Sequence, residues 1–194
     1  MQALMFEVKP KENHEQHYFD RAAALRPRLE LNGGILFIDR YKSLDRAGIV
    51  LSHSHWRIDE AHHKTQSAGL NIHFEDYRIR ISHVLRYKAG AGPATTWTAD
   101  GTYKAASAST SRYLAIIGTE GRPSDNTGEG FQSVNVEERF LTIVEPVSEE
   151  DGRDLIAKAE TSRHVTSTLL SIVSRDYGMY DREEAPQYFP PVRS

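Results

Sequence analysis

Residues 35–56 read ILFIDRYKSLDRAGIVLSHSHW, and this stretch decides the fold. Two runs rich in apolar and aromatic residues, 35–41 and 49–56, flank a polar segment at 42–48. Two such runs on either side of a short polar loop are typical of a β-hairpin. We therefore expect two antiparallel strands here, joined by the polar loop.

The chain before this hairpin predicts one strand followed by one helix. Residues 3–8 are apolar and end at Pro10, which has no amide proton for ladder pairing. Residues 12–30 carry apolar side chains at the three- and four-residue spacing of a helix that buries one face. The residues of this stripe are Tyr18, Ala22, Leu25 and Leu29.

The chain after the hairpin predicts a second helix and a fourth strand. Asp59 is a good N-cap residue for a helix running to about residue 67. Residues 76–87 alternate in polarity, which is typical of a strand. The resulting order, β-α-β-β-α-β, is the ferredoxin-like arrangement of an α+β protein. Its helices cover one sheet face, so the other face needs a partner sheet.

The second half resembles the first, which suggests an internal duplication. Residues 51–60 resemble 141–150, and 81–86 resemble 170–175 at an almost constant offset. The alternative is a pair of unrelated strand-helix-strand segments that only look alike. We expect three parts: a ferredoxin-like repeat at 1–88, a linker or long loop at 89–111, and a degenerate second repeat at 112–194.

The second repeat is expected to lack its first helix. Its first two strands would be 113–118 and 131–138, and the 119–130 segment between them is short and rich in Gly and Pro. Parallel pairing among the strands of this half would contradict the duplication.

Composition excludes several classes of protein. The chain has 194 residues, a formal charge of −3 and no cysteine, which rules out disulfides, thiolate metal sites and cysteine nucleophiles. We expect no nucleic-acid binding from this charge. No apolar run approaches the length of a membrane span, and residues 1–10 are unlike a secretory signal. We therefore expect a cytoplasmic protein that does not contact membranes.

Several motifs resemble one known family, the antibiotic-biosynthesis monooxygenases. They are MFEVKP at 5–10, FIDRY at 37–41, SHWR at 54–57, FEDYRIR at 74–80 and RDYGMYDR at 175–182. The resemblance implies a dimeric α/β barrel in which two four-stranded sheets pack face to face. If the duplication is real, one chain could form this barrel as a pseudo-dimer; otherwise a homodimer is expected. The resemblance also implies oxidation of aromatic molecules or haem, often without a metal or flavin cofactor.

The family's aromatic oxygenases carry Asn, then Trp four residues on, then Tyr six residues further. This chain has Ser52, Trp56 and His62 at those positions, so only the Trp is retained. The haem-degrading branch is disfavoured, because Lys64 stands where its helical Trp would fall and the first strand has no Asn.

Trp56 and His62 are the candidate catalytic residues. The Trp56 ring could stack on a flat substrate, and His62 could act as a general base because an ordinary imidazole titrates near neutral pH. Ser52 and Arg78 are the candidate substrate-binding residues. The structural alternatives are that Trp56 is core, that His62 is solvated, and that Arg78 pairs with a neighbouring acid such as Asp39 or Glu75.

A second candidate site is a metal site on the other face of the same strand. His53 and His55 point to one face, because side chains alternate along a strand. Glu7 and His83 could share that face, and imidazoles with a carboxylate suit iron or zinc. The structural alternative is a polar barrel interior.

The sequence therefore predicts a monooxygenase-like enzyme, without a cofactor, that acts on a small flat aromatic or quinol-like molecule. The alternatives are a non-catalytic binding or stress-related protein on the same scaffold and a metal-dependent enzyme that uses the histidines. Fold alone does not decide among these functions.

Overall fold

The computed structural model describes residues 1–31, 34–57, 73–97, 112–123 and 127–185. Its first half contains β1 (Gln2–Pro10), α1 (Glu15–Leu31), β2 (Ile35–Ser43), β3 (Val50–Trp56), β4 (Phe74–Ala89) and the short β5 (Thr95–Thr96). Its second half contains β6 (Tyr113–Glu120), β7 (Glu129–Ser133), β8 (Arg139–Val144), α3 (Glu149–Ala159) and β9 (Val165–Gly178). The helix predicted at 59–67 lies outside the described residues.

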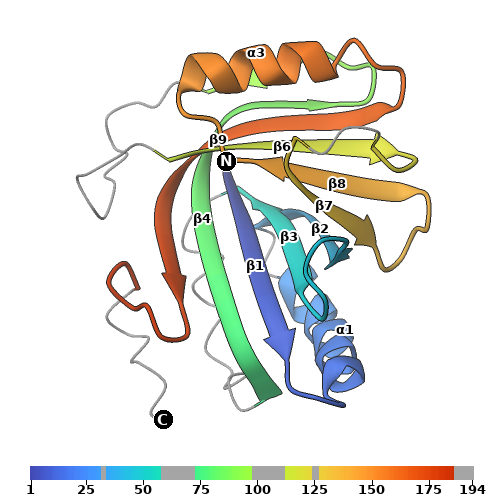
Figure 1. The fold of residues 1–194 in the computed structure, drawn as a ribbon, viewed down its shortest axis with the longest axis vertical. Helices are drawn as coiled ribbons and strands as arrows, with labels where there is room; N and C mark the ends of the chain where they lie inside the picture. Colours follow the sequence, from blue (N-terminus) through green and yellow to red (C-terminus); the bar gives the residue numbers. More distant parts are fainter. Residues whose placement is uncertain (32–33, 58–72, 98–111, 124–126, 186–194) are drawn as a thin grey trace.

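Eight strands close into an antiparallel barrel. The hydrogen-bonded order is β1-β3-β2-β7-β8-β6-β9-β4, and β4 returns to pair with β1, while β5 extends the edge of β4. All of these pairings are antiparallel. One chain thus supplies every strand of the barrel (Figure 1).

The predicted hairpin is present and sets the register of the first half. β2 and β3 pair so that Asp39 lies opposite His53 and Phe37 lies opposite His55. β3 also pairs with β1, which places Met5 opposite His53. Residues directly opposite one another share a face of the sheet. The register therefore directs both histidines to the same side as Met5.

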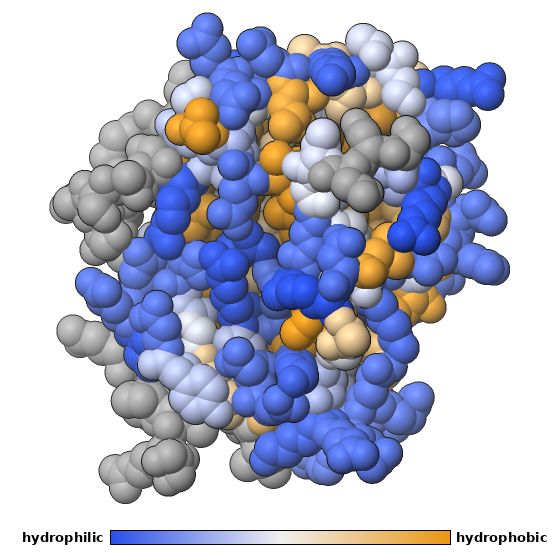
Figure 2. Space-filling model, viewed as in Figure 1, coloured by the Kyte–Doolittle hydropathy of each residue, from blue (hydrophilic) through white to orange (hydrophobic). Residues whose placement is uncertain are grey.

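The inner side of the barrel is a core of its own. Its buried residues include Met5, Leu51, Phe131, Leu141 and Leu169, which come from both halves of the chain. The two halves therefore share one hydrophobic interior, as expected when two sheets bury their uncovered faces against each other. Polar residues dominate the visible outer surface, where hydrophobic side chains appear only in small areas (Figure 2).

Helices cover the outer side of the barrel. Tyr18 and Leu29 of α1 pack on the outward residues of the first four strands, and Ile156 of α3 packs on Leu170 of β9. Ser148 caps α3 by accepting a hydrogen bond from the Asp151 amide at 3.1 Å. The acidic residues at 149–151 are thus a helix start, as the sequence indicated. None of the described helices is long and apolar enough to cross a membrane.

The second half departs from expectation at one turn. β7 ends at Ser133, whereas the sequence predicted a strand over 131–138. The Ser133 hydroxyl accepts hydrogen bonds from the amides of Asn135 and Val136, which turns the chain before the start of β8. A serine hydroxyl that bonds to nearby amides competes with strand pairing in this way.

Candidate functional site

A cavity of about 370 Å³ lies at one end of the barrel interior. Its walls come from both halves of the chain, with His53 and His55 on β3, Tyr87 on β4, Gly118 on β6 and Ser167 on β9. Its volume is at the small end of the range for ligand pockets, which is about 300–1,000 Å³. A small ring compound is the size of ligand that such a space suits.

Two imidazoles form the polar centre of this cavity. The Nε2 atoms of His53 and His55 lie 3.0 Å apart, which is hydrogen-bond distance. One ring must donate its proton and the other must accept it, because two neutral imidazoles cannot both donate along one contact. The Nδ1 atom of His53 is buried and makes no well-formed hydrogen bond with any described residue.

Burial keeps both imidazoles neutral. It lowers the pKa of His53 to about 4, and the main chain of Leu4 offsets only part of that effect. Burial, followed by the neighbouring His53, lowers the pKa of His55 to about 2. A buried charge without a partner is costly, so these rings remain uncharged at neutral pH. They can form hydrogen bonds with a ligand but are weak bases.

Aromatic rings surround the histidine pair. The His55 ring centroid lies 5.0 Å from that of Phe37 and 5.1 Å from that of Tyr87. Tyr41 and Phe140 add further aromatic surface to the cavity wall. Rings of this kind bind a flat apolar molecule well and exclude water from it.

A buried carboxylate holds the turn that forms one wall of the cavity. Asp39 accepts hydrogen bonds from Ser133 Oγ at 3.1 Å, Asn135 Nδ2 at 2.7 Å and Arg139 Nη1 at 3.0 Å. Val136, Glu138 and Arg139 then line the opening. Asp39 therefore positions this wall without lining the cavity itself.

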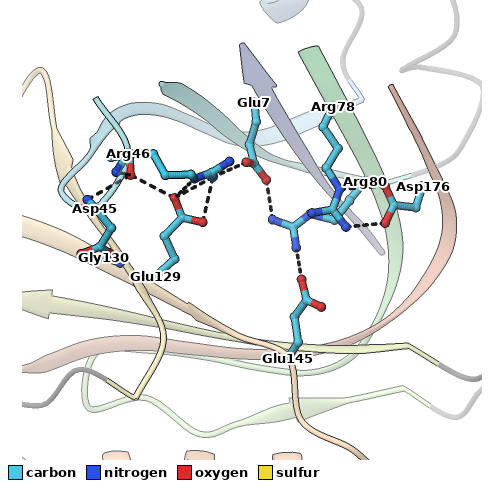
Figure 3. A network of polar contacts seen from close by, with 10 residues as sticks. Glu7, Asp45, Arg46, Arg78, Arg80, Glu129, Gly130, Glu145 and Asp176 are labelled. Atoms are coloured by element: carbon cyan, nitrogen blue, oxygen red, sulfur yellow. Dashed lines mark hydrogen bonds and ion pairs between the residues drawn. The ribbon is translucent and has the colours of Figure 1, made fainter. Parts of the chain in front are cut away.

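A network of charged residues lies at the opposite end of the barrel. Figure 3 shows Glu7 and Arg80 pointing toward one another, with Arg80 Nη2 at 2.5 Å from Glu7 Oε1. Arg80 also contacts Glu145 at 2.8 Å, and Arg46 links Glu7 to Glu129. These bonds join strands and loops of the two halves. Burial alone would raise the pKa of Glu7, but Arg80 and Arg46 hold it below its usual value.

Trp56, one of the two predicted catalytic residues, is separated from this cavity. Trp56 is buried in the core between sheet and helix, its indole donates to Ser54 Oγ at 2.8 Å, and it does not line the cavity. Ser52 lies on the same outward face of β3 as Trp56. His62 lies outside the described residues. A catalytic role for Trp56 and His62 therefore stays a prediction.

Arg78 is not near the cavity either. It donates to Asp176 at 2.9 Å from Nε and at 2.7 Å from Nη2, at the charged end of the barrel. An ion pair was the expected alternative, but the partner is Asp176. The two acids suggested for it have other partners, because Asp39 binds Arg139 and Glu75 binds Lys9 at 2.5 Å.

The four residues of the predicted metal site do not come together. His53 and His55 share a face as expected, but the Glu7 carboxylate is occupied by two arginines. His83 lies opposite Gln2, on the same side of the sheet as Leu4 and Ile81 and away from the other two histidines. Among the described residues there is no group of three or more side chains able to hold a metal ion.

Sequence reasoning identified His53 and His55 but missed the other cavity residues. The usable signal was the alternation of 37–41 and 51–55, which also directs Phe37 and Tyr41 inward. Tyr87, Gly118 and Arg139 gave no such signal, since only the strand order brings them to the histidines.

A full-length relative decides the family. The chain is 31% identical to "Jasmonate monooxygenase ABM" of Pyricularia oryzae over 218 aligned positions, covering 99% of this chain and 100% of the relative. The chain belongs to the antibiotic-biosynthesis monooxygenase family. Its membership supports an oxidoreductase with monooxygenase-like activity. No family model matches the sequence.

Two solved structures also resemble the structure of this chain. One is a protein of Lactobacillus acidophilus NCFM provisionally described as a monooxygenase, with a TM-score of 0.42 and 10% identity over 89% of this chain and 92% of the other. The other is an anthrone oxidase-like protein, with a TM-score of 0.37 and 7% identity over 91% of this chain and 92% of the other. Both scores are low, so the assignment rests on the sequence relative.

Proposed function

We propose that this protein oxidises a small cyclic or flat organic molecule in the barrel cavity, using dioxygen and no metal or flavin of its own. The observation that carries the proposal is the neutral His53–His55 pair, with Nε2 atoms 3.0 Å apart, inside an aromatic cavity. The full-length relative, which is named a jasmonate monooxygenase, supports the class of reaction.

The reaction that fits such a site is one in which the substrate supplies the electrons. A methylene group next to an aromatic or carbonyl group becomes a carbonyl, so R₂CH₂ and O₂ give R₂C=O and H₂O. One oxygen atom enters the substrate and the other leaves as water. No further reductant is needed for this balance.

The histidine pair would orient the substrate in this reaction. A neutral imidazole can accept a hydrogen bond from an enol or phenol hydroxyl, or donate one to a carbonyl. With a pKa of about 4 or lower, neither ring is suited to remove a proton from a weakly acidic carbon. The surrounding rings would exclude water, which strengthens these hydrogen bonds.

Oxygen uptake tests the proposal. The full chain is incubated in air with an anthrone, with jasmonate and with methyl jasmonate, each of which has a methylene group next to an aromatic ring or a carbonyl group. Dioxygen consumption and product mass are measured together. We expect one dioxygen per substrate and a product about 14 mass units heavier, formed without added metal, flavin or nicotinamide. Tight binding with no oxygen uptake would support the alternative of a non-catalytic binding protein. Activity only after metal addition would support the metal-dependent alternative.

We also propose that the chain is an internal duplication that forms the barrel as a single pseudo-dimer. The strand order β4-β1-β3-β2 of the first half corresponds to β9-β6-β8-β7 in the second, and β6 leads to β7 without an intervening described helix. If this is correct, the protein should be active as a monomer. Light scattering and turnover measured over a hundredfold range of protein concentration would reveal any need for a second copy.

A further inference from the structure

The charges around the cavity point to the class of ligand that it accepts. Its described lining includes two acidic residues, Glu120 and Glu138, and one arginine, Arg139. Arg139 is the only cation among them. A ligand with a carboxylate would need that cation, or a charged imidazole, as its partner.

Arg139 already has a partner. Its Nη1 atom donates to Asp39 Oδ2 at 3.0 Å, and the Asp39 side chain is only 5% exposed. A ligand carboxylate that took Arg139 as its partner would leave the buried Asp39 carboxylate without this ion pair. Removing one partner of a buried ion pair is strongly unfavourable. Arg139 is therefore a poor anchor for an acid.

The imidazoles cannot take the place of that cation. His53 and His55 are 2% and 5% exposed and face each other through their Nε2 atoms. Burial keeps them uncharged, so they provide dipoles and not positive charge. Hydroxyl and carbonyl groups suit such dipoles, whereas a desolvated carboxylate does not.

The opening of the cavity adds weak repulsion. Glu120 and Glu138 both line it and are both exposed. The Gly121 amide donates to the Glu138 carbonyl at 2.7 Å, which keeps these two chain segments side by side. These two exposed carboxylates outnumber the one arginine of the described lining, which lies opposite Glu120 in the β6–β8 register, so an approaching anion meets a weak net negative charge, more so at low salt.

We propose that the cavity selects uncharged molecules bearing a hydroxyl or carbonyl group and rejects the carboxylate forms of the same molecules. This inference rests on the proposed function, because it names the substrate class of that site. If it is correct, this chain differs from an enzyme that binds its substrate through the carboxylate of that substrate.

A matched pair of probes tests the inference. 2-Naphthamide and 2-naphthoate have nearly the same shape and differ in charge at neutral pH; methyl jasmonate and jasmonate form a second pair. Titration calorimetry with the full chain at pH 7.5 should show the uncharged member of each pair binding at least about tenfold more tightly.

Acidification provides a stricter test. If only the protonated acid binds, the apparent affinity for 2-naphthoate should rise about tenfold for each pH unit between 7.5 and 5.5, because the competent fraction rises by that factor. The affinity for 2-naphthamide should stay constant over the same range, which also reports an intact cavity. Equal or tighter binding of the carboxylate at pH 7.5, or no rise on acidification, would overturn the inference.

The two proposals can fail separately. If jasmonate binds better than methyl jasmonate and is turned over with dioxygen, the proposed function stands and the charge selection is wrong. If neither member of either pair binds, both proposals are wrong. Glu138→Gln should strengthen 2-naphthoate binding a few-fold at low salt without changing 2-naphthamide binding. Glu137→Gln is the matched control, because Glu137 is exposed but does not line the cavity.

Discussion

His53 and His55 face each other across 3.0 Å on the inner side of β3, while Trp56, the next residue, packs on the outer side. β3 thus carries one candidate site on its inner face and another on its outer face. The described residues of the inner one hold an uncharged pair of imidazoles in an aromatic cavity. This separation makes the two sites testable one at a time.

The pH profile of turnover should distinguish the two sites. Because the pKa of His53 is about 4 and that of His55 about 2, both rings stay neutral throughout the range from pH 8 to 5.5. We expect kcat/KM to be flat over this range if the pair orients the substrate. Steady-state oxygen uptake at constant ionic strength is the measurement. An inflection near pH 6.5, the ordinary value for histidine, would instead favour a histidine base outside this pair, such as His62.

Substitution on the two faces of β3 gives an independent test. His55→Phe removes both ring nitrogens but keeps a flat ring, so turnover should fall about tenfold to a hundredfold, the loss expected for a substrate hydrogen bond. Trp56→Phe is the matched control on the outer face and should change turnover less than threefold, an order-of-magnitude expectation for a conservative core change. The opposite ranking, or a large loss in His62→Ala alone, would move the chemistry away from the histidine pair.

The strands of the first half were predictable because alternation along single strands is visible in the sequence. The pattern of 35–56 specified the hairpin, and the H-x-H spacing correctly placed His53 and His55 on one face. The cavity was not predictable, because its walls depend on pairings between distant segments. Asp39 and Arg139 are 100 residues apart in the chain yet bonded at 3.0 Å, and nothing local to either residue indicates this. The end of β7 was missed because Ser133 redirects the backbone through its hydroxyl.

Buried neutral histidines should make the protein sensitive to mild acid. The folded pKa of His53, about 4, lies below its ordinary value of 6.5, so the unfolded chain binds the proton first. The contribution of the neutral rings to the free energy of unfolding is fully present above pH 6.5. It is lost as the pH falls toward 4, by up to about 1.4 kcal/mol per pH unit for each ring. His53→Gln should therefore show a shallower fall in Tm from pH 7 to 4.5. If Tm falls with pH equally steeply in the variant and the wild type, His53 does not contribute to the acid sensitivity.

The Glu7–Arg80 pair should contribute strongly to the stability of the barrel. Both side chains are 4% exposed, so Glu7→Ala leaves a buried guanidinium whose one remaining ion-pair partner among the described residues is the exposed Glu145. We expect a loss of about 3–5 kcal/mol in the free energy of unfolding, typical of breaking a buried pair. Glu75→Ala removes the exposed Lys9–Glu75 pair and should cost less than about 1 kcal/mol. If urea unfolding shows the same loss of free energy for Glu7→Ala and Glu75→Ala, the network in Figure 3 adds little to the stability of the barrel.

Asp39 should control the cavity wall without contacting the ligand. Its carboxylate binds the Ser133, Asn135 and Arg139 side chains, so Asp39→Ala releases the turn at 134–138 from β2. We expect destabilisation by about 2–4 kcal/mol, since three donors, one of them the buried Ser133 hydroxyl, lose their acceptor. We also expect a higher KM because the wall is no longer fixed. Arg139→Gln takes the ion-pair partner from the buried Asp39 carboxylate but keeps an amide donor, so it should cost about 1–3 kcal/mol. Unfolding curves and KM values for both variants are the measurements. If Asp39→Ala binds 2-naphthamide as the wild type does, the turn is held by other contacts and Asp39 has no positioning role.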